Sequence, residues 1–432
     1  MKYLVLLLFF LLHTAVDASA QERLTLDDAI RLALEQNHQI EVARNNEEIA
    51  RNSVHIGNAG LLPKLDASAS SNYSDRESSG SALTDGASTT TSAQLQLSYT
   101  LFDGLGNVAR LKRLIESGRL GELTARRLIE NTLFQVSTAY YAVAAAEESY
   151  RIARELAVIS RERLQRAKNR SVFGQANAIE VLAAQVDLNA DSVTVTQARY
   201  RLDEARRQLN LLLNREIDRS FTVDGEVVFP ETVNLGVLEQ KAVENNADYL
   251  IARHQRRRSH HDLRLAQSAR LPRVDIDAAY SLNRTESDLN LSLSDPDRTL
   301  RTGVQLSLNL FNGFQTRIGI QNARLELENV KQLEQEAELI LHKELKDAYE
   351  AYLNSRTVLA LEDKNEQAAE LNFVRTEELY GLGQVTTTQF REAQLNLIRA
   401  RSSISNAKYN AKLNEIELLR LSGMLMANLT FN

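Results

Sequence analysis

The chain has 432 residues, 43% of them hydrophobic and 25% charged, with only 17 Gly and 4 Pro, so it is neither disordered nor collagen-like. Four prolines are far fewer than the average of about 5% would give, which favours long uninterrupted helices. The net charge of -6 gives no support for nucleic-acid binding. Cysteine is absent, which excludes disulfides, thiolate metal sites, cysteine nucleophiles and lipid attachment to cysteine.

The N-terminal segment, 1–20, is typical of a secretory signal peptide. Lys2 precedes the apolar run from Leu4 to Leu12, and the small-residue segment Ala18-Ser19-Ala20 follows before Gln21. No later run of about 18 apolar residues predicts a membrane-spanning helix. We therefore expect cleavage near Ala20, export of the mature chain, and no lipid anchor.

The sequence matches itself at a constant offset of 209 in residue number. The matches include Leu62-Pro63 with Leu271-Pro272, Leu101-Phe102-Asp103-Gly104 with Leu310-Phe311-Asn312-Gly313, and Gly174-Gln175 with Gly383-Gln384. A period of this length indicates two tandem copies of one structural unit. The predicted organisation is a signal peptide at 1–20, a first repeat at 21–214, a linker or equatorial segment at 215–232, and a second repeat at 233–432.

In each copy the sequence pattern predicts, in chain order, a helix, two strands, a long helix and a second helix that runs back, which we call the returning helix. Thr25 and Asn234 are predicted as the N-caps of the first helices of the two copies, and the first of these helices is expected to end near Gly57 and Gly60. After Pro63 and Pro272 apolar residues alternate with Gln, Ser, Asn and Thr, which predicts amphipathic strands of about ten residues with polar loops over 75–91 and 285–302. Long helices are predicted over 104–170 and 313–379, followed by returning helices over 177–214 and 386–422.

Four such strands cannot close a membrane barrel, because closed barrels begin at about eight strands and an open edge leaves backbone groups unsatisfied in lipid. The chain is therefore expected to oligomerise. Two copies would give a lumen filled by side chains, whereas three would leave an aqueous passage.

The paired strand starts at Pro63 and Pro272, the Leu-Phe-Asp/Asn-Gly turns and the duplication resemble the TolC-type outer-membrane efflux protein family over nearly the whole mature chain. The resemblance implies an α+β membrane protein: a homotrimeric 12-stranded transmembrane β-barrel, four strands per chain, in the outer membrane of a Gram-negative bacterium, continued by a long periplasmic α-helical barrel. It implies passive transport through the exit duct of a tripartite efflux pump or type I secretion system. The implied partners are a periplasmic adaptor protein, an inner-membrane transporter and outer-membrane lipid.

Two sets of turns are candidate sites under this resemblance. The strand-to-helix turns contain Phe102, Asp103, Gly104, Phe311, Asn312 and Gly313. The hairpin turns at the periplasmic tip, expected to contact the adaptor, contain Phe173, Gly174, Gln175, Leu382, Gly383 and Gln384. The two tip glycines also fit the left-handed cap that any tight helical hairpin needs.

The candidate pore constriction and gate consists of Glu180, Tyr380, Gln389 and Glu392. Threefold symmetry would turn Glu180 and Glu392 into carboxylate rings that attract cations. Asn177-x-x-Glu180 and Thr386-x-x-Gln389 also fit capping boxes, so capping alone could explain Glu180. Glu392 has no such local role and is the better candidate for the constriction.

The resemblance matches Tyr380 and Glu180 to a tyrosine and an acid that hold the closed state in the family. A tyrosine beside a helix end also fits ordinary packing. An arginine of that lock falls on Val385, and one of two constriction acids falls on Gln389, so we expect fewer ionic links and one constriction acid per chain.

No pattern predicts catalysis, a metal or a cofactor, and we do not expect an enzyme. His254, His260 and His261 lie in a basic run over 253–264 that fits a solvated helix face. The alternative to a duct is a secreted coiled-coil scaffold or a periplasmic adaptor protein without a membrane barrel.

Overall fold

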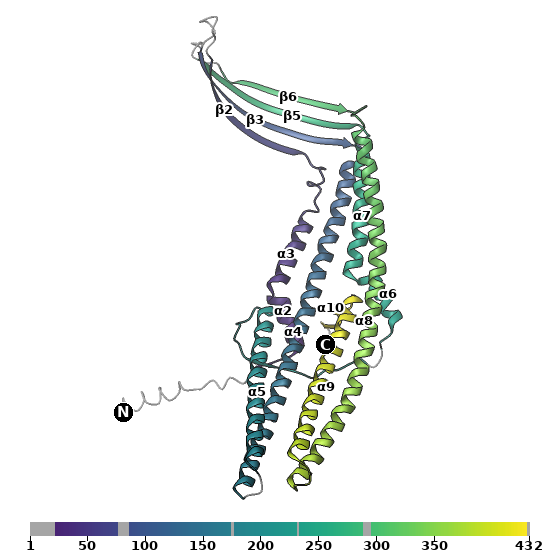
Figure 1. Cartoon of the computed structure of the whole chain (residues 1–432). Coiled ribbons are helices and arrows are strands. Elements are labelled where there is room, and N and C mark those ends of the chain that lie inside the picture. The colour runs from purple at the N-terminus through teal and green to yellow at the C-terminus, as the bar shows by residue number, and fades with distance from the viewer. Residues whose placement is uncertain (1–21, 77–85, 174–176, 231–232, 288–294, 430–432) are drawn as a thin grey trace, which may run out of the picture. The chain divides into compact units, whose positions relative to one another are not determined.

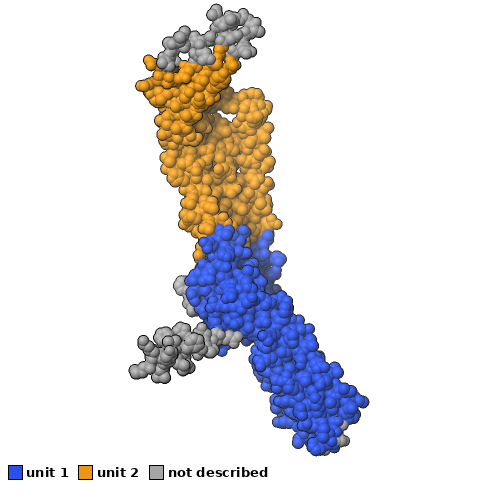
Figure 2. All heavy atoms as spheres, turned by 90° about the vertical axis from the view of Figure 1, so that its left-hand side faces the viewer, with its two compact units in different colours: residues 1–43, 126–246, 340–432 blue, residues 44–125, 247–339 orange. Residues whose placement is uncertain are grey.

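The computed structural model describes residues 22–76, 86–173, 177–230, 233–287 and 295–429. Long helices and one large sheet make up most of it (Figure 1). The chain forms two compact units (Figure 2). Unit 1 contains Met1–Ala43, Arg126–Asn246 and Ile340–Asn432, and unit 2 contains Arg44–Ala125 and Ala247–Leu339. Each unit therefore takes residues from both halves of the chain.

Unit 2 contains a four-stranded antiparallel sheet with the strand order β2-β3-β5-β6. The strands are β2 (Lys64–Arg76), β3 (Gly86–Asp103), β5 (Arg273–Ser287) and β6 (Asp297–Ser307). In the central pair, Leu97 faces Ala278 and Ser98 faces Asp277, so apolar and polar pairs alternate along the strands. The two halves of the chain thus meet at the β3–β5 pair.

The strands are longer than predicted and occupy about half of the residues of the predicted loops. Predicted loop residues at 86–91 belong to β3, and those at 297–302 belong to β6. Hydroxyl pairs join the strands there: Ser71 and Thr91 lie 3.3 Å apart, and so do Thr90 and Thr285. Threonine favours extended backbone and pairs across strands, so a Ser/Thr-rich composition was a poor sign of a loop. The strand expected to reach Leu310 ends at Ser307.

The helices of unit 2 are held by close backbone approach and by ion pairs. They are α7 (Ala247–Ser268) and parts of α3 (His38–Asn52), α4 (Gly106–Val172) and α8 (Gln315–Gly381). An added Cβ at Gly118 would lie 2.6 Å from Val54, so α4 packs tightly on the segment after α3. Arg113 of α4 pairs with Asp262 of α7 at 3.3 Å, and Arg256 of α7 pairs with Glu334 of α8.

Unit 1 contains the remaining helices, the other parts of α3, α4 and α8, and a two-stranded parallel sheet. Its elements are β1 (Glu22–Leu24), α2 (Leu26–Gln36), α5 (Ala178–Leu212), β4 (Phe221–Val223), α6 (Leu235–Asn245), α9 (Thr387–Leu421) and α10 (Leu425–Leu429). Helices α4 and α8 have 67 residues each, and α5 and α9 have 35 each. In each pair both bounds are separated by the offset of the sequence repeat. Within the described ranges, no helix is both long and apolar enough to cross a membrane.

The prediction of one continuous helix from Thr25 to about Gly57 is wrong, because Asn37 divides it into α2 and α3. The side-chain amide of Asn37 donates to the carbonyl of Leu212 at 2.7 Å, and its oxygen accepts from the Gln39 amide. Asn246, its equivalent in the second repeat, separates α6 from α7 and donates to the carbonyl of Leu421 at 3.0 Å. Each break caps one helix and ties it to a returning helix.

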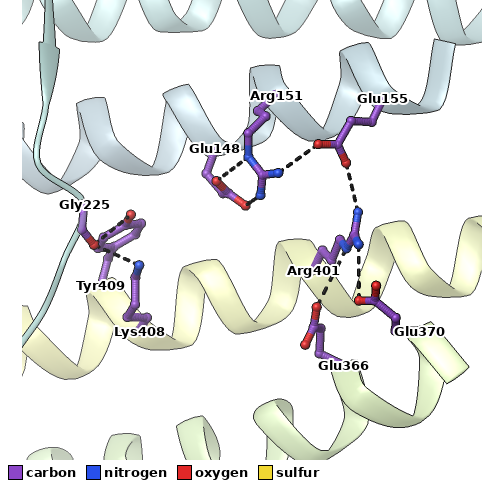
Figure 3. Close-up of polar contacts among 9 residues, drawn as sticks. All are labelled: Glu148, Arg151, Glu155, Gly225, Glu366, Glu370, Arg401, Lys408 and Tyr409. Atoms are coloured by element: carbon purple, nitrogen blue, oxygen red, sulfur yellow. Dashed lines mark hydrogen bonds and ion pairs between the residues drawn. The ribbon is translucent and has the colours of Figure 1, made fainter. Parts of the chain in front are cut away.

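The predicted linker crosses the helices of unit 1 as an extended segment, residues 221–229, that we call the belt. The Tyr140 hydroxyl accepts from the Asp224 amide at 2.9 Å, and burial raises the pKa of Tyr140. Lys408 donates to the carbonyl of Gly225 at 2.8 Å (Figure 3). The Arg356 guanidinium lies 4.1 Å from the ring centre of Phe229. The belt is therefore bound to helices from both halves of the chain.

Candidate functional site at the helical hairpins

The turn from α8 to α9 is built around Gly383, whose φ is +74°. The Gly383 amide donates to the carbonyl of Tyr380 at 3.1 Å, and the Gln384 amide donates to the carbonyl of Leu379 at 2.9 Å. This pair of bonds is the Schellman arrangement that closes a helix with a left-handed residue. A Cβ at Gly383 would meet nothing within 4 Å, so the backbone conformation, and not packing, requires glycine.

The side chains beside both hairpin turns are open to solvent. Phe173, at the end of α4, is 77% exposed, and Leu382 is 71% exposed. The predicted tip residues Gly174 and Gln175 lie outside the described residues. The described part of the two turns thus presents large apolar side chains without an intrachain packing partner that would cover them.

The capping box predicted at the start of α9 is confirmed. The Gln389 amide donates to Thr386 Oγ1 at 3.2 Å, and the Thr386 amide donates to Gln389 Oε1 at 2.8 Å. The Gln389 side chain therefore satisfies a backbone donor at the helix start.

The equivalent box at the start of α5 is only half formed. Asn177 Oδ1 accepts from the Glu180 amide at 3.0 Å, as predicted. The Glu180 carboxylate does not return the bond: it accepts from the Thr387 hydroxyl at 2.9 Å and lies 3.7 Å from Arg170. Capping is therefore the wrong explanation for the Glu180 side chain, which joins the first turns of α5 and α9.

Tyr380 packs in an apolar cluster. Its ring stacks on Phe390 with centres 4.6 Å apart and an interplanar angle of 18°. Phe373, Ala393 and Leu397 complete the cluster. Among the described residues Glu180 bonds Thr387 and Arg170, and no bond joins it to Tyr380. Within one chain, Tyr380 thus has the packing role and the latch is not formed.

A buried polar network, which the sequence analysis did not find, joins α9 to the hairpin of α4 and α5. Two guanidinium nitrogens of Arg391 donate to the Asp191 carboxylate, each at 2.8 Å. Ser160 of α4 also donates to Asp191, and Arg163 pairs with Asp187 at 2.8 Å. The side chains of Asp191 and Arg163 are only 5% and 4% exposed.

A comparison of the two sequence repeats indicates this network. The repeat equivalents of Arg391 and Asp191 are Leu182 and Ala400, so the charges stand where the other copy is apolar. A bidentate arginine and carboxylate pair is both strong and geometrically specific. The network therefore fixes the alignment of α9 on the first hairpin.

A second set of charges lies along the same helices. Arg401 of α9 contacts Glu155 of α4 at 2.9 Å and Glu370 of α8 at 3.2 Å, and Glu366 lies 3.7 Å away (Figure 3). Arg151 extends this set by contacting Glu148 and Glu155. Exposed pairs of this kind contribute little one by one, but Arg401 joins three helices at one point.

A groove of about 770 Å³ runs between the first turns of α5 and α9. Glu180, Glu392, Arg163, Arg391 and Arg399 are among the residues that line it. Glu392 is exposed, and within the described ranges no ion pair engages its carboxylate. It is therefore free to act on an ion in the adjoining space, whereas Gln389 and Glu180 are already bonded.

Of the six strand-to-helix turn residues, Gly104 and Gly313 have φ values of +68° and +63°. A Cβ at Gly104 would come within 2.6 Å of the carbonyl of Ser268, so this glycine also permits close approach to α7. Asp103 and Asn312 each accept from a helix-start amide four residues later, at 3.0 Å and 3.3 Å. Phe102 and Phe311 are exposed. These turns therefore redirect the chain and begin α4 and α8.

A family model described as outer membrane efflux protein matches residues 29–215 and again residues 238–424. The chain belongs to this family. The two matches are separated by the same offset as the repeats found in the sequence. The chain is thus an outer-membrane efflux protein and a channel component, and the scaffold or adaptor alternative is not favoured.

Curated relatives are similar along most of their length. The chain is 21% identical to Outer membrane protein TolC of Escherichia coli over 402 residues, covering 90% of this chain and 80% of that protein. It is 24% identical to Alkaline protease secretion protein AprF of Pseudomonas aeruginosa over 411 residues, covering 93% and 84%. It is 20% identical to Cation efflux system protein CusC of Escherichia coli O157:H7, covering 90% and 84%.

Solved channel structures share the fold. The Campylobacter jejuni CmeC outer membrane channel superposes with a TM-score of 0.77 at 17% identity, covering 93% of this chain and 86% of that chain. VceC of Vibrio cholerae superposes with a TM-score of 0.75 at 16% identity, covering 92% and 96%. The chain therefore has the mixed α and β fold of these outer-membrane channels.

Proposed function

We propose that this chain is the exit duct of a tripartite efflux pump or type I secretion system, through which cargo passes passively across the outer membrane and periplasm. The observation that carries the proposal is the double match to the outer membrane efflux family over both halves of the chain. One relative is named for cation efflux and another for alkaline protease secretion, which supports export as the shared task. A periplasmic adaptor and an inner-membrane transporter would complete the assembly.

The working state we propose is a homotrimer with a 12-stranded barrel. The sheet of one chain ends in two open edges, β2 and β6, whose backbone groups have no partner in the described sheet. An open edge is costly in lipid, and pairing β6 of one copy with β2 of the next removes it. Three copies close twelve strands around an aqueous lumen, and the helices continue it as an α-helical barrel.

Duplication of a single repeat supports this arrangement. The helices and the first strand of each pair recur in the second half with starts at the repeat offset, and the cap residues Asn37 and Asn246 recur with them. The repeats would be 21–214 and 233–432, joined by an equatorial segment at 215–232, with a signal peptide removed near Ala20. Six repeats per trimer would form a pseudo-sixfold tube.

The hairpin turns form the periplasmic tip in this proposal. The exposed Phe173 and Leu382 would contact the adaptor, with Gly383 and Gln384 shaping the second turn. Three copies of Glu392 would form the constriction ring, since no ion pair with another described residue engages its carboxylate. Glu180 would act through its bond to Thr387, and a latch to Tyr380 would have to form between chains.

The test combines the mass of the detergent-extracted protein with single-channel conductance in a planar bilayer. We expect a trimer that conducts, with a cation preference that falls toward none in Glu392→Ala. The equivalent position of the first repeat is Ala183, so Ala183→Glu is a matched variant and should raise cation preference. A monomer that forms no channel contradicts the duct, and an unchanged preference in Glu392→Ala contradicts the ring.

A further inference from the structure

The helix ends next to the strands of unit 2 carry positive charge and no acid. Residues 104–115, 263–272 and 313–325 follow β3, precede β5 and follow β6, respectively. Together they contain seven cations and no Asp or Glu, although the chain has a net charge of -6. The seven are Arg110, Lys112, Arg113, Arg264, Arg270, Arg317 and Arg324. Residues 53–63, which precede β2, contain no Lys, Arg, Asp or Glu.

Two of these seven cations have partners within the chain. Arg110 donates to the carbonyl of Ala59 at 3.0 Å, and Arg113 pairs with Asp262. The other five are exposed and have neither an ion pair nor a side-chain hydrogen bond in the part of the chain that the structure describes. Arg270 follows the end of α7, and we call the four that lie within helices the cationic collar. They are Lys112, Arg264, Arg317 and Arg324. Their charges are therefore available to an external partner.

Exposed apolar side chains accompany the collar on the same helix faces. Val108, Lys112 and Ile115 recur at helical spacing on α4 and are all exposed. At the start of α8, Phe314 is 57% exposed and contacts the exposed Phe311 edge to face at 5.4 Å. Arg317 and Arg324 follow Phe314 three and ten residues later, on one face of α8.

The collar residues Lys112 of α4 and Arg264 of α7 both act on His261 of α7. Burial and the charge of His260 lower the pKa of His261, Arg264 and Lys112 lower it further, and Glu116 acts in the opposite direction. Ion pairs join α4 to α7 and α7 to α8. The cations thus form a surface spread over neighbouring helices, with aromatic and aliphatic side chains among them.

We propose that the cationic collar binds the phosphate groups of anionic phospholipid headgroups in the membrane leaflet next to the strand bases. The inference rests on the proposed function, because it takes the sheet as the membrane-spanning part. Lys112 lies six residues into α4, about 9 Å along the axis, and its long side chain can reach back toward a headgroup layer about 5–8 Å thick.

The composition of this surface favours lipid over a small anion. Aromatic and aliphatic groups mixed with Lys and Arg are typical of the membrane–water interface, and clustered cations attract anionic headgroups. A free phosphate would need several donors that converge on one point. The collar is instead distributed over three helices, so it fits many headgroups side by side.

The experiment is native mass spectrometry of the detergent-extracted protein mixed with palmitoyl-oleoyl phosphatidylglycerol or the matching phosphatidylcholine. We expect the wild type to retain more phosphatidylglycerol and K112Q/R264Q/R317Q/R324Q to lose about tenfold or more of that preference. The matched control, R161Q/K168Q/R201Q/R375Q, removes one Lys and three Arg that are exposed in unit 1 and should keep the preference. High salt should weaken the wild-type preference.

Several outcomes overturn the proposal: equal retention of both lipids by the wild type, an unchanged preference in the collar variant, or an equal loss in the control. Displacement of phosphatidylglycerol by inorganic phosphate, but not by chloride at the same ionic strength, would also overturn it, since that indicates a small-anion site. If the fourfold variant fails to fold, the half-collar variants K112Q/R264Q and R317Q/R324Q decide the matter, since each should lose part of the preference and two unchanged preferences would overturn the proposal. Trimer mass and conductance are measured on the same samples, so failure of the duct is recorded separately from failure of the collar.

Discussion

The two helical hairpins of unit 1 share their backbone plan but differ in how their side chains are used. Helices α5 and α9 have 35 residues each and begin with a side-chain cap. At the start of α9, Gln389 completes a capping box, whereas Glu180 of α5 turns to the other hairpin. Arg391 of α9 forms a buried ion pair where α5 has Leu182. Side chains at equivalent backbone positions thus have different roles. The hairpin of α4 and α5 supplies the acids, and the hairpin of α8 and α9 supplies the arginine that binds them.

The largest loss of stability is expected from removing Asp191, the acid that only the first hairpin has at this position. Asp191→Ala leaves Arg391 buried without its partner, so the free energy of unfolding should fall by about 3–5 kcal/mol. Thermal unfolding of the detergent-extracted protein, followed by circular dichroism, measures this loss.

A double variant tests whether the pair itself carries the effect. Asp191→Ala with Arg391→Leu gives both positions the residue types of their repeat equivalents and should recover most of the stability. If the double variant is as unstable as the single one, the network is not what distinguishes the hairpins.

The second effect concerns the turn of α8 and α9. Gly383→Ala forces a side chain into a left-handed conformation, with no steric clash, and should cost about 1–2 kcal/mol. The control is Gly381→Ala, two residues earlier at the end of α8, where an added Cβ also meets open space. This change should leave the free energy of unfolding unchanged or raise it by up to about 1 kcal/mol. Equal effects at both positions would mean that the backbone angle does not matter.

The third effect concerns the complete capping box of α9. Thr386→Ala removes the oxygen that accepts from the Gln389 amide and should cost about 1 kcal/mol. Thr388→Ala is the same chemical change inside the first turn, where the wild-type threonine is exposed, and should be neutral or slightly stabilising. A loss at Thr388 as large as that at Thr386 would argue against the cap.

The smallest effect lies outside the hairpin turns, at Glu415 of α9. Burial raises the pKa of Glu415 above 4.5, although Lys412 and Arg356 act in the opposite direction. The folded state therefore binds this proton more tightly than the unfolded state, which adds stability at low pH that is lost as the pH rises through the folded pKa.

Glu415→Gln should accordingly raise the unfolding midpoint at pH 7, by less than the loss expected for Thr386→Ala. The gain over the wild type should disappear as the pH falls below the folded pKa of Glu415, where its carboxyl group is protonated. A gain that is independent of pH would assign the effect to packing.

Local signals in the sequence predicted the long elements well. The predicted helix 104–170 is observed as Gly106–Val172, because the positive-φ glycine at its start and the absence of proline act locally. The caps at Asn177 and Thr386 were also predicted, since a cap depends on residues only three positions away.

Features that depend on distant residues were missed. The break at Asn37 requires the carbonyl of Leu212, and the short strands β1 and β4 require each other. The Arg391–Asp191 pair joins positions 200 residues apart that no periodicity relates. At the tip, the sequence already favoured Glu392 over Glu180 for the constriction, but the bond between Glu180 and Thr387 joins positions far apart in the chain and was not predicted.

The strand order of unit 2 has a consequence for how the chain can be made. Because β3 pairs with β5, Thr100 cannot pair until Asp275 has been synthesised, and the centre of the sheet forms only then. Closing a loop of that length is entropically unfavourable and slow, and an unpaired β3 edge invites aggregation meanwhile. A chain stopped after the belt would lack α7, β5 and β6, so the first half could not finish its own sheet. The newly exported chain therefore needs protection of its strands until its last third has arrived.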